Sequence, residues 1–125
     1  MKLLRIHHAQ ITVPPGAETE ARAFYCALLG LQEVPKPAAL AVRGGFWLQL
    51  GDAQIHVGVE ENPNRAASRV HVAYEVDDLP GLAKELAARG VEMKDNEKIP
   101  GYERFEVRDP FGNRVEFLQQ TRSTP

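Results

Sequence analysis

Four side chains of the types that bind metal ions occupy matching positions in the two halves of this sequence. They are His8, His56, His71 and Glu116. His8 and His71 lie 63 residues apart, and His56 and Glu116 lie 60 apart. Imidazole and carboxylate groups are the ligands expected for zinc, iron, manganese, nickel or cobalt. If the fold gathers these side chains around one point, they predict a divalent metal site.

The segments that carry the four residues have the composition of β-strands, in which successive side chains point to opposite faces. The predicted strands span residues 6–13, 54–60, 69–76 and 113–119. In each strand the candidate ligand lies on the face opposite the apolar side chains that would pack against helices. A sheet that curls around this second face would bring the four residues together.

The order of elements also repeats. In each half a strand is followed by a helix and then by three more strands. The first copy is predicted at 6–13, 21–28, 31–34, 46–50 and 54–60, and the second at 69–76, 79–86, 91–94, 104–108 and 113–119. Apolar residues at i, i+3, i+4 and i+7 predict the helices, and Gly30 and Gly90 are placed to end them. Asp77 and Asp78 are suitable N-cap residues for the second helix, and residues 109–112 predict a turn.

These elements predict an α+β fold of two tandem βαβββ modules within a single domain over 1–125. Module one spans about 4–60 and module two about 69–119. The polar segment 61–68 lacks apolar periodicity and is interpreted as the linker between them.

Each candidate ligand alone has an ordinary explanation. A strand histidine is more often exposed or hydrogen-bonded than bound to metal, and Glu116 alone fits the solvated face of a one-sided sheet. His7 has no counterpart in the second half and is interpreted as structural or exposed. The shared parity and the repeated spacing of the other four residues favour a metal site.

Composition restricts the classes of partner. The hydrophobic content of 43% and the charged content of 26% are ordinary for a globular protein in water. The net charge is −2 and the basic residues are scattered, which argues against nucleic acid. No apolar run approaches the length that crosses a bilayer, so no membrane partner is expected. The N-terminus lacks a signal-peptide pattern and Cys26 is the single cysteine, so a cytoplasmic protein is expected.

Four motifs carry a resemblance to a known family. They are HxxxxV at 8–13, ARAFYCALLGL at 21–31, HVAYEVDDL at 71–79 and DPFGNRVEF at 109–117. With them the chain resembles the vicinal oxygen chelate superfamily, which includes glyoxalase I, extradiol dioxygenases, fosfomycin-resistance transferases and bleomycin-resistance proteins. The resemblance implies a half-open, barrel-like mixed sheet with helices on the outside, built around a divalent metal ion (Zn, Ni, Co, Mn or Fe). A homodimer is expected by the same analogy.

The resemblance also implies roles for individual residues. The family's ligands fall on His8, His71 and Glu116, and Glu116 would also be the catalytic carboxylate. His56 stands where glyoxalase I has a glutamate, so His56 is either a fourth ligand or a neighbour of the ligands. Without a second glutamate, true glyoxalase I activity is not expected.

Five further residues are candidates for substrate binding: Gln10, Arg43, Trp47, Tyr102 and Arg104. Trp47 has the ordinary alternative of a core position, and the two arginines that of solvated surface charge.

Three functions remain open. The first is a metal-dependent lyase, isomerase, dioxygenase or transferase that acts on a small oxygenated molecule. The second is a bleomycin-resistance-like protein that sequesters a small molecule without catalysis. The third, a structural domain with an incidental polar interior, would leave buried histidines and a carboxylate uncompensated. At 125 residues the chain also lacks the four-module length associated with extradiol dioxygenases.

Overall fold

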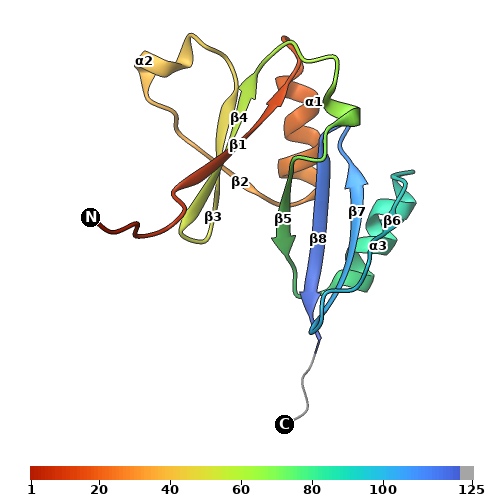
Figure 1. The fold of residues 1–125 in the computed structure, drawn as a ribbon. Helices are drawn as coiled ribbons and strands as arrows, with labels where there is room; N and C mark the ends of the chain where they lie inside the picture. The colour runs from red at the N-terminus through yellow and green to blue at the C-terminus, as the bar shows by residue number, and fades with distance from the viewer. Residues whose placement is uncertain (122–125) are drawn as a thin grey trace. The chain divides into compact units, whose positions relative to one another are not determined.

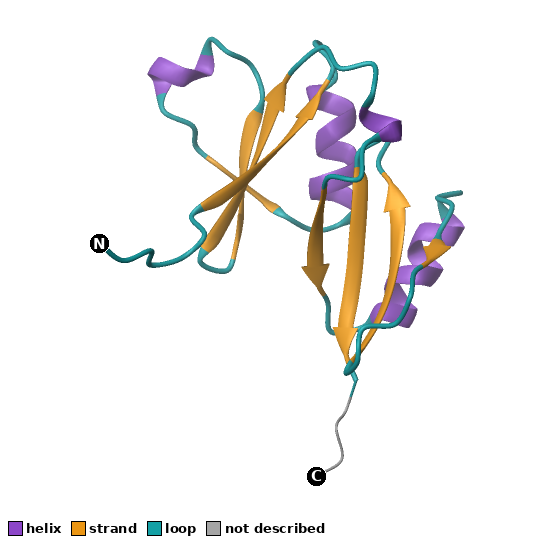
Figure 2. Ribbon diagram, in the orientation of Figure 1, coloured by secondary structure: helices purple, strands orange, loops and turns teal. Residues whose placement is uncertain are grey.

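The computed structural model describes residues 1–121, and the chain divides at Pro63 and Asn64 into two compact units. Each unit contains a four-stranded mixed sheet and at least one helix (Figures 1 and 2). The predicted α+β class with a repeated βαβββ order is confirmed. No helix of the described residues is long and apolar enough to pass through a lipid bilayer.

The first unit is built from four strands, β1 to β4, and three helical segments. Its elements are β1 (His8–Val13), α1 (Glu18–Arg22), the π-helical turn η1 (Ala23–Leu28), β2 (Gln32–Val34), α2 (Ala38–Ala41), β3 (Phe46–Leu50) and β4 (Ala53–Val59). The strand order is β1-β4-β3-β2, in which β1 runs parallel to β4 and the other pairs are antiparallel. One face of this sheet buries Phe46, Leu48, Ile55 and Val57. Helix α1 contacts this face, since the guanidinium of Arg22 lies 4.5 Å from the centre of the Phe46 ring.

The second unit repeats this arrangement. Its elements are the 3-10 turn η2 (Arg65–Ala67), β5 (His71–Glu75), α3 (Leu79–Ala88), β6 (Lys94–Asp95), β7 (Tyr102–Arg108) and β8 (Arg114–Gln120). The strand order is β5-β8-β7-β6, and β5 runs parallel to β8 as β1 does to β4. The buried face carries Tyr74, Phe105, Val107, Val115 and Phe117, against which Leu79 and Leu86 of α3 are also buried.

Local sequence signals fix the ends of the elements. The side chain of Asp78 caps α3, because its Oδ1 accepts a hydrogen bond from the backbone N–H of Gly81 at 3.0 Å. In the turn before β8, Oδ1 of Asp109 accepts from the backbone N–H groups of Phe111 and Asn113, each at 2.9 Å. Gly112 completes this turn with a φ of 97°, a conformation that glycine adopts without penalty.

Several details differ from the sequence-based expectation. The helix expected over 21–28 is α1 followed by the π-helical η1, β5 is shorter than the expected 69–76, and β7 begins at Tyr102 rather than residue 104. Strand β1 begins at His8 rather than residue 6, because pairing with β4 starts at the carbonyl of His7, which accepts from Gln54. The strand expected over 91–94 is only Lys94–Asp95, since the N–H of Val91 still bonds to Leu86 at the end of α3. The short helix α2, with only four residues and no amphipathic period, was not predicted.

Candidate functional site

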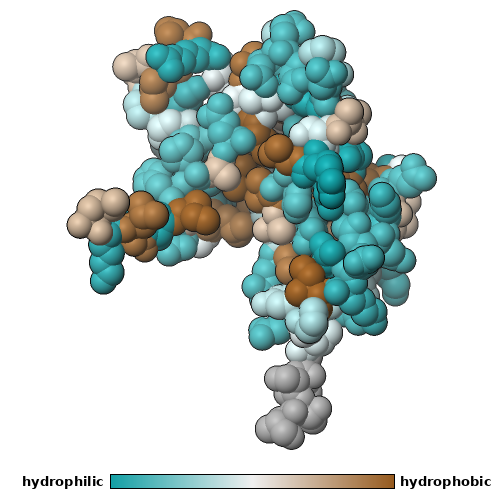
Figure 3. All heavy atoms as spheres, viewed as in Figure 1, coloured by the Kyte–Doolittle hydropathy of each residue, from teal (hydrophilic) through white to brown (hydrophobic). Residues whose placement is uncertain are grey.

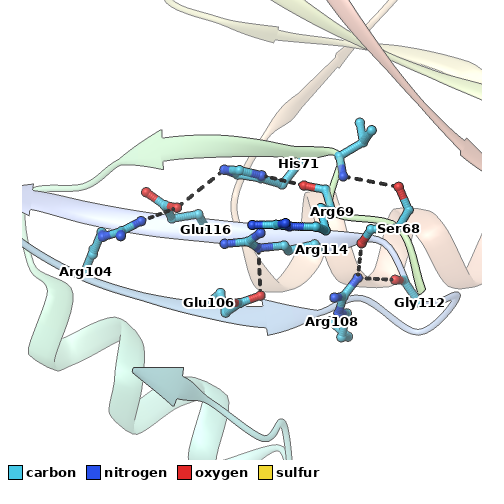
Figure 4. A network of polar contacts seen from close by, with 10 residues as sticks. Ser68, Arg69, His71, Arg104, Glu106, Arg108, Gly112, Arg114 and Glu116 are labelled. Carbon is cyan, nitrogen blue, oxygen red and sulfur yellow. Dashed lines mark hydrogen bonds and ion pairs between the residues drawn. The ribbon is translucent and has the colours of Figure 1, made fainter. Parts of the chain in front are cut away.

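In the second unit, the face of the sheet opposite the apolar core carries His71, Glu116 and Arg104. Ala73 and Glu106 lie directly across from Glu116 in the strand register, so strand parity puts all of these side chains on one face. The Nε2 atom of His71 lies 3.5 Å from Oε1 of Glu116, and Nη1 of Arg104 donates a hydrogen bond to the same oxygen at 2.9 Å (Figure 4). Glu116 is only 3% exposed. The carboxylate is therefore buried, and one of its oxygens has both neighbours.

The tautomer of His71 follows from its second contact. Its Nδ1 lies 3.0 Å from the backbone carbonyl oxygen of Arg69, which can only accept a hydrogen bond (Figure 4). Nδ1 therefore carries a proton, and in the neutral ring the lone pair is on Nε2, which faces Glu116. Two acceptors face each other at 3.5 Å, an arrangement that is favourable only if the ring is protonated or a cation binds both. A histidine whose Nδ1–H is held by a carbonyl is typical of metal ligands, so these two residues fit a divalent cation.

A second ion pair lies beside the first. Nε of Arg114 is 2.8 Å from Oε2 of Glu106, and Glu106 lies opposite Glu116 in the register of β7 and β8. Two buried carboxylates thus neighbour each other, each with its own arginine (Figure 4). Nε of Arg104 also donates to the carbonyl of Glu97 at 2.7 Å, which fixes the guanidinium in place. The predicted substrate-binding residue Arg104 therefore contacts the catalytic candidate itself.

In the first unit, His56 lies between two other rings. The rings of His56 and Trp47 are stacked, with centroids 4.1 Å apart and planes inclined by 2°. On the other side, the rings of His56 and His8 are 4.0 Å apart with planes inclined by 15°. His56 is 6% exposed. Burial, with the nearby cationic forms of His8, His7 and Lys36, lowers the pKa of His56 to about 4, so the ring is neutral near pH 7.

His8 is exposed and has a neighbour that the sequence pattern did not predict as part of the site. Its Nδ1 lies 2.9 Å from Nδ1 of His7, so one of the two nitrogens donates to the other. This contact engages Nδ1 of His8 and leaves Nε2 as the nitrogen without a described partner. His7 is exposed, as one of the two interpretations of the sequence held.

The remaining candidates are less closely connected. Gln10 is exposed and lies opposite His56 in the register of β1 and β4. Arg43 is exposed in the turn after α2, and Tyr102 is half-buried at the start of β7. No described contact joins Arg43 or Tyr102 to the candidate ligands.

The structure thus brings His71 together with Glu116, and His8 together with His56. Within residues 1–121, no group of three or more His, Cys, Asp or Glu side chains lies close enough to hold a metal ion. Sequence analysis did not identify the backbone carbonyl of Arg69 or the side chain of Gln54 as partners of the histidines. The alternation of β7 does carry one missed signal, because Arg104 and Glu106 have the parity that places them beside Glu116.

Comparisons with a family model and with solved structures indicate the same protein family. The model of the Glyoxalase/Bleomycin resistance protein/Dioxygenase superfamily matches residues 5–117. A glyoxalase family protein from Bacillus anthracis, known from its crystal structure, is 43% identical, with 97% of this chain and 98% of that chain covered and a TM-score of 0.88. Comparison with curated proteins finds no significant match.

Two more distant structures share the fold. The antibiotic-binding protein TnmS3 from Streptomyces sp. CB03234 is 20% identical, with 97% and 99% of the two chains covered and a TM-score of 0.72. The fosfomycin resistance protein FosX from Listeria monocytogenes, solved with Mn(II) and sulfate, is 15% identical, with 97% and 93% covered and a TM-score of 0.74. One of these proteins binds an antibiotic and the other was solved with a metal ion.

Proposed function

Because this chain belongs to the glyoxalase/bleomycin resistance protein/dioxygenase superfamily, we propose that it is a metal-dependent enzyme acting on a small oxygenated molecule. In this proposal His8, His71 and Glu116 bind one divalent cation. The observation that carries it is the approach of Nε2 of His71 and Oε1 of Glu116 to 3.5 Å on a buried face. With His71 neutral both atoms are acceptors, and a bound cation would bridge them.

The orientation of the histidines supports the same proposal. Nδ1 of His71 is held by a backbone carbonyl, so that Nε2 is its available nitrogen. Such a partner fixes the tautomer and the direction of a ligating imidazole. In His8, Nε2 is available to a metal when Nδ1 of His8 is the donor in its contact with His7. Two histidines and one carboxylate leave coordination positions open for a substrate.

When bound, the metal would act as a Lewis acid for two neighbouring substrate oxygens. The residues of the chain supply the proton transfer and the local charge. No described contact uses Oε2 of Glu116, so this oxygen is placed to accept a proton from the substrate. Arg104 holds Oε1 in a fixed position, and its cationic charge would stabilise an oxyanion that develops close by.

The test is a zinc titration of the chelator-treated full-length protein by calorimetry, with Mn²⁺ and Ni²⁺ as alternatives. Wild type is expected to bind about one ion per chain, and Glu116→Gln and His71→Ala to lose at least 10-fold in affinity, as is typical of metal-site changes. Glu103→Gln is the matched control, because Glu103 is an exposed glutamate of the neighbouring strand whose described partner is Lys98. Equal affinity in all four proteins would contradict the proposed ligands.

A second candidate function is sequestration of a small molecule without catalysis. It is favoured by Arg104, which already neutralises the buried Glu116 without any metal. If this function is correct, the chelator-treated protein binds a flat cationic drug that does not itself bind metal, and added zinc leaves that affinity unchanged. Loss of drug binding after chelation would instead favour the enzyme.

A further inference from the structure

A chain of hydrogen bonds in the first unit fixes the tautomer of His56. It starts in the turn between β3 and β4, where Nε2 of Gln49 lies 2.8 Å from the carbonyl of Gly51 and 3.1 Å from that of Ala53. Backbone carbonyls only accept hydrogen bonds, so the amide nitrogen of Gln49 must face them. Its Oε1 then faces Gln54 at 3.0 Å, and it accepts from the amide nitrogen of that residue.

This orientation leaves only one role for His56. With its nitrogen used by Gln49, the Gln54 amide presents Oε1 to Nε2 of His56 at 2.8 Å. An amide oxygen accepts, so Nε2 of His56 must carry the proton and donate it. Nε2 of His56 is therefore not available to a metal, in contrast to Nε2 of His71.

The stacking of the rings prevents Nδ1 of His56 from sharing a metal ion with His8. A metal ion lies close to the plane of the imidazole that binds it, at about 2 Å from the nitrogen. The planes of His8 and His56 are inclined by only 15° with centroids 4.0 Å apart, so they stay separated over that distance. One ion bound in the plane of His8 does not lie in the plane of His56.

We propose that His56 is a positioning residue for His8 and not a fourth metal ligand. Gln49 and Gln54 hold its ring, Trp47 covers one side, and His8 stacks on the other. The stack orients a histidine that is otherwise exposed on the first strand of its sheet. The inference rests on the proposed function in one respect, namely that His8 binds the metal.

The first test is ¹⁵N NMR of the histidine rings in the full-length protein without metal at pH 7. Nε2 of His56 is expected to be protonated and in slow exchange with water, and its Nδ1 to be unprotonated. An Nδ1–H tautomer or a rapidly exchanging mixture would overturn the assignment. Zinc is then added, and the ring nitrogens of His8 and His71 are expected to shift while those of His56 keep their positions. A shift of Nδ1 of His56 to the range of a zinc-bound nitrogen would also overturn it.

The second test separates stacking from ligation by substitution. His56→Phe, combined with Gln54→Leu so that no acceptor is left unpaired, keeps an aromatic ring but offers no nitrogen. It is expected to weaken zinc binding by about twofold, whereas His56→Ala loses the stack and weakens it by about 10-fold. If His56 were a ligand, the phenylalanine variant would lose at least as much affinity as the alanine variant. Thermal denaturation of each variant confirms that it is folded.

The outcomes distinguish this inference from the proposed function. If zinc shifts none of the histidines, the proposed metal site is wrong, and the metal-free spectra still decide the role of His56. In these spectra the His8 side chain is expected to keep one rotamer in wild type and in the phenylalanine variant and to become averaged in His56→Ala. An averaged His8 side chain in wild type would overturn the positioning role.

Discussion

One carboxylate oxygen of Glu116 has two neighbours, one that stabilises its negative charge and one that does so only when protonated. Nη1 of Arg104 donates to Oε1, while Nε2 of a neutral His71 would repel it. The carboxylate is buried, so the arginine is needed wherever no cation is bound. Arg104 thus keeps the buried Glu116 compensated in the absence of a bound cation.

This balance predicts the effect of Arg104→Met. Removing one partner of a buried ion pair leaves an unpaired charge, and the expected loss is about 3 kcal/mol in the free energy of unfolding. Urea denaturation in the presence of a chelator measures this loss, and added zinc is expected to recover part of it. Lys84→Met, at an exposed position of α3, is the control and should change stability by less than about 0.5 kcal/mol. Equal losses in both variants would contradict the role of Arg104.

The low pKa of His56 predicts that the free energy of unfolding depends on pH. Its pKa is about 4 in the folded chain, against an ordinary value of 6.5. Between these values the unfolded chain takes up a proton that the folded chain does not, so stability falls as the pH is lowered. From pH 7 to pH 5 the expected loss is about 2 kcal/mol relative to His56→Phe/Gln54→Leu, in which this proton site is missing. Urea denaturation of both proteins at each pH checks this, and parallel pH profiles would contradict it.

For single residues, the sequence predicted the face of the sheet to which a side chain points, but not which other side chains it contacts. Strand parity alone assigned Glu116 and His71 to the polar face, and the register agrees. Parity does not choose rotamers, so it could not show that Arg104 would turn to Glu116 or that His56 would lie flat on Trp47. Those contacts depend on side chains from three strands that meet only in the folded sheet.

At the scale of elements, the hairpin of β3 and β4 carries both Trp47 and His56, and a close backbone approach sets its position. Gly45 precedes β3 with a φ of 80°, and a Cβ built there would lie 2.1 Å from the carbonyl oxygen of Val57. Its N–H also donates to Glu18 of α1 at 3.3 Å. Only glycine fits this position, and through it the start of β3 is placed against both β4 and α1.

Gly45→Ala is therefore expected to destabilise the chain by about 3 kcal/mol, since backbone strain and a steric clash act together. Gly16→Ala is the matched control, because Gly16 has a φ of 81° but nothing within 4 Å of its Cβ position. The control carries the strain alone and is expected to lose about 1 kcal/mol. Thermal or urea unfolding measures both, and similar losses would show that the approach to Val57 is unimportant.

Most elements could be predicted because their signals are local. The spacing of apolar residues predicted α3, and Asp78, Gly90 and the 109–112 turn predicted its limits and the start of β8. Helix α2 escaped prediction, and the bounds of β6 were predicted wrongly, for a physical reason. Each has too few residues to show a period, and β6 depends on pairing with β7 at only two positions.

At the scale of the whole molecule, the two units have the same strand order, which agrees with the repeat in the sequence. The segment ahead of β1 exposes apolar side chains, with Leu4 85% and Ile6 78% accessible. Brown spheres mark this segment near the N-terminus in Figure 3. Apolar groups that gather on a surface mark sites of association, which fits the homodimer that the family resemblance implies. The cytoplasmic location stays a prediction from the sequence.

The homodimer that the family resemblance implies can be tested by sedimentation. Wild type is expected to sediment as a dimer at micromolar concentration, and Leu4→Glu/Ile6→Glu to shift the equilibrium toward the monomer because two charges would have to be buried. Val42→Glu is the control, since Val42 is 89% exposed on another segment of the same unit. A monomeric wild type, or an unchanged dimer in the double variant, would contradict this role of the N-terminal segment.

The central claim is that the chain holds a catalytic divalent metal, and the metal content of the native protein tests it most directly. The protein is purified without a chelator or an affinity tag and analysed by inductively coupled plasma mass spectrometry, beside Glu116→Gln and Glu103→Gln. About one ion per chain is expected in wild type and in Glu103→Gln, and much less in Glu116→Gln, because a proposed ligand has been removed. Wild-type protein that carries no metal and takes up none from Zn²⁺, Mn²⁺, Fe²⁺, Co²⁺ or Ni²⁺ would contradict the claim and leave sequestration as the better account.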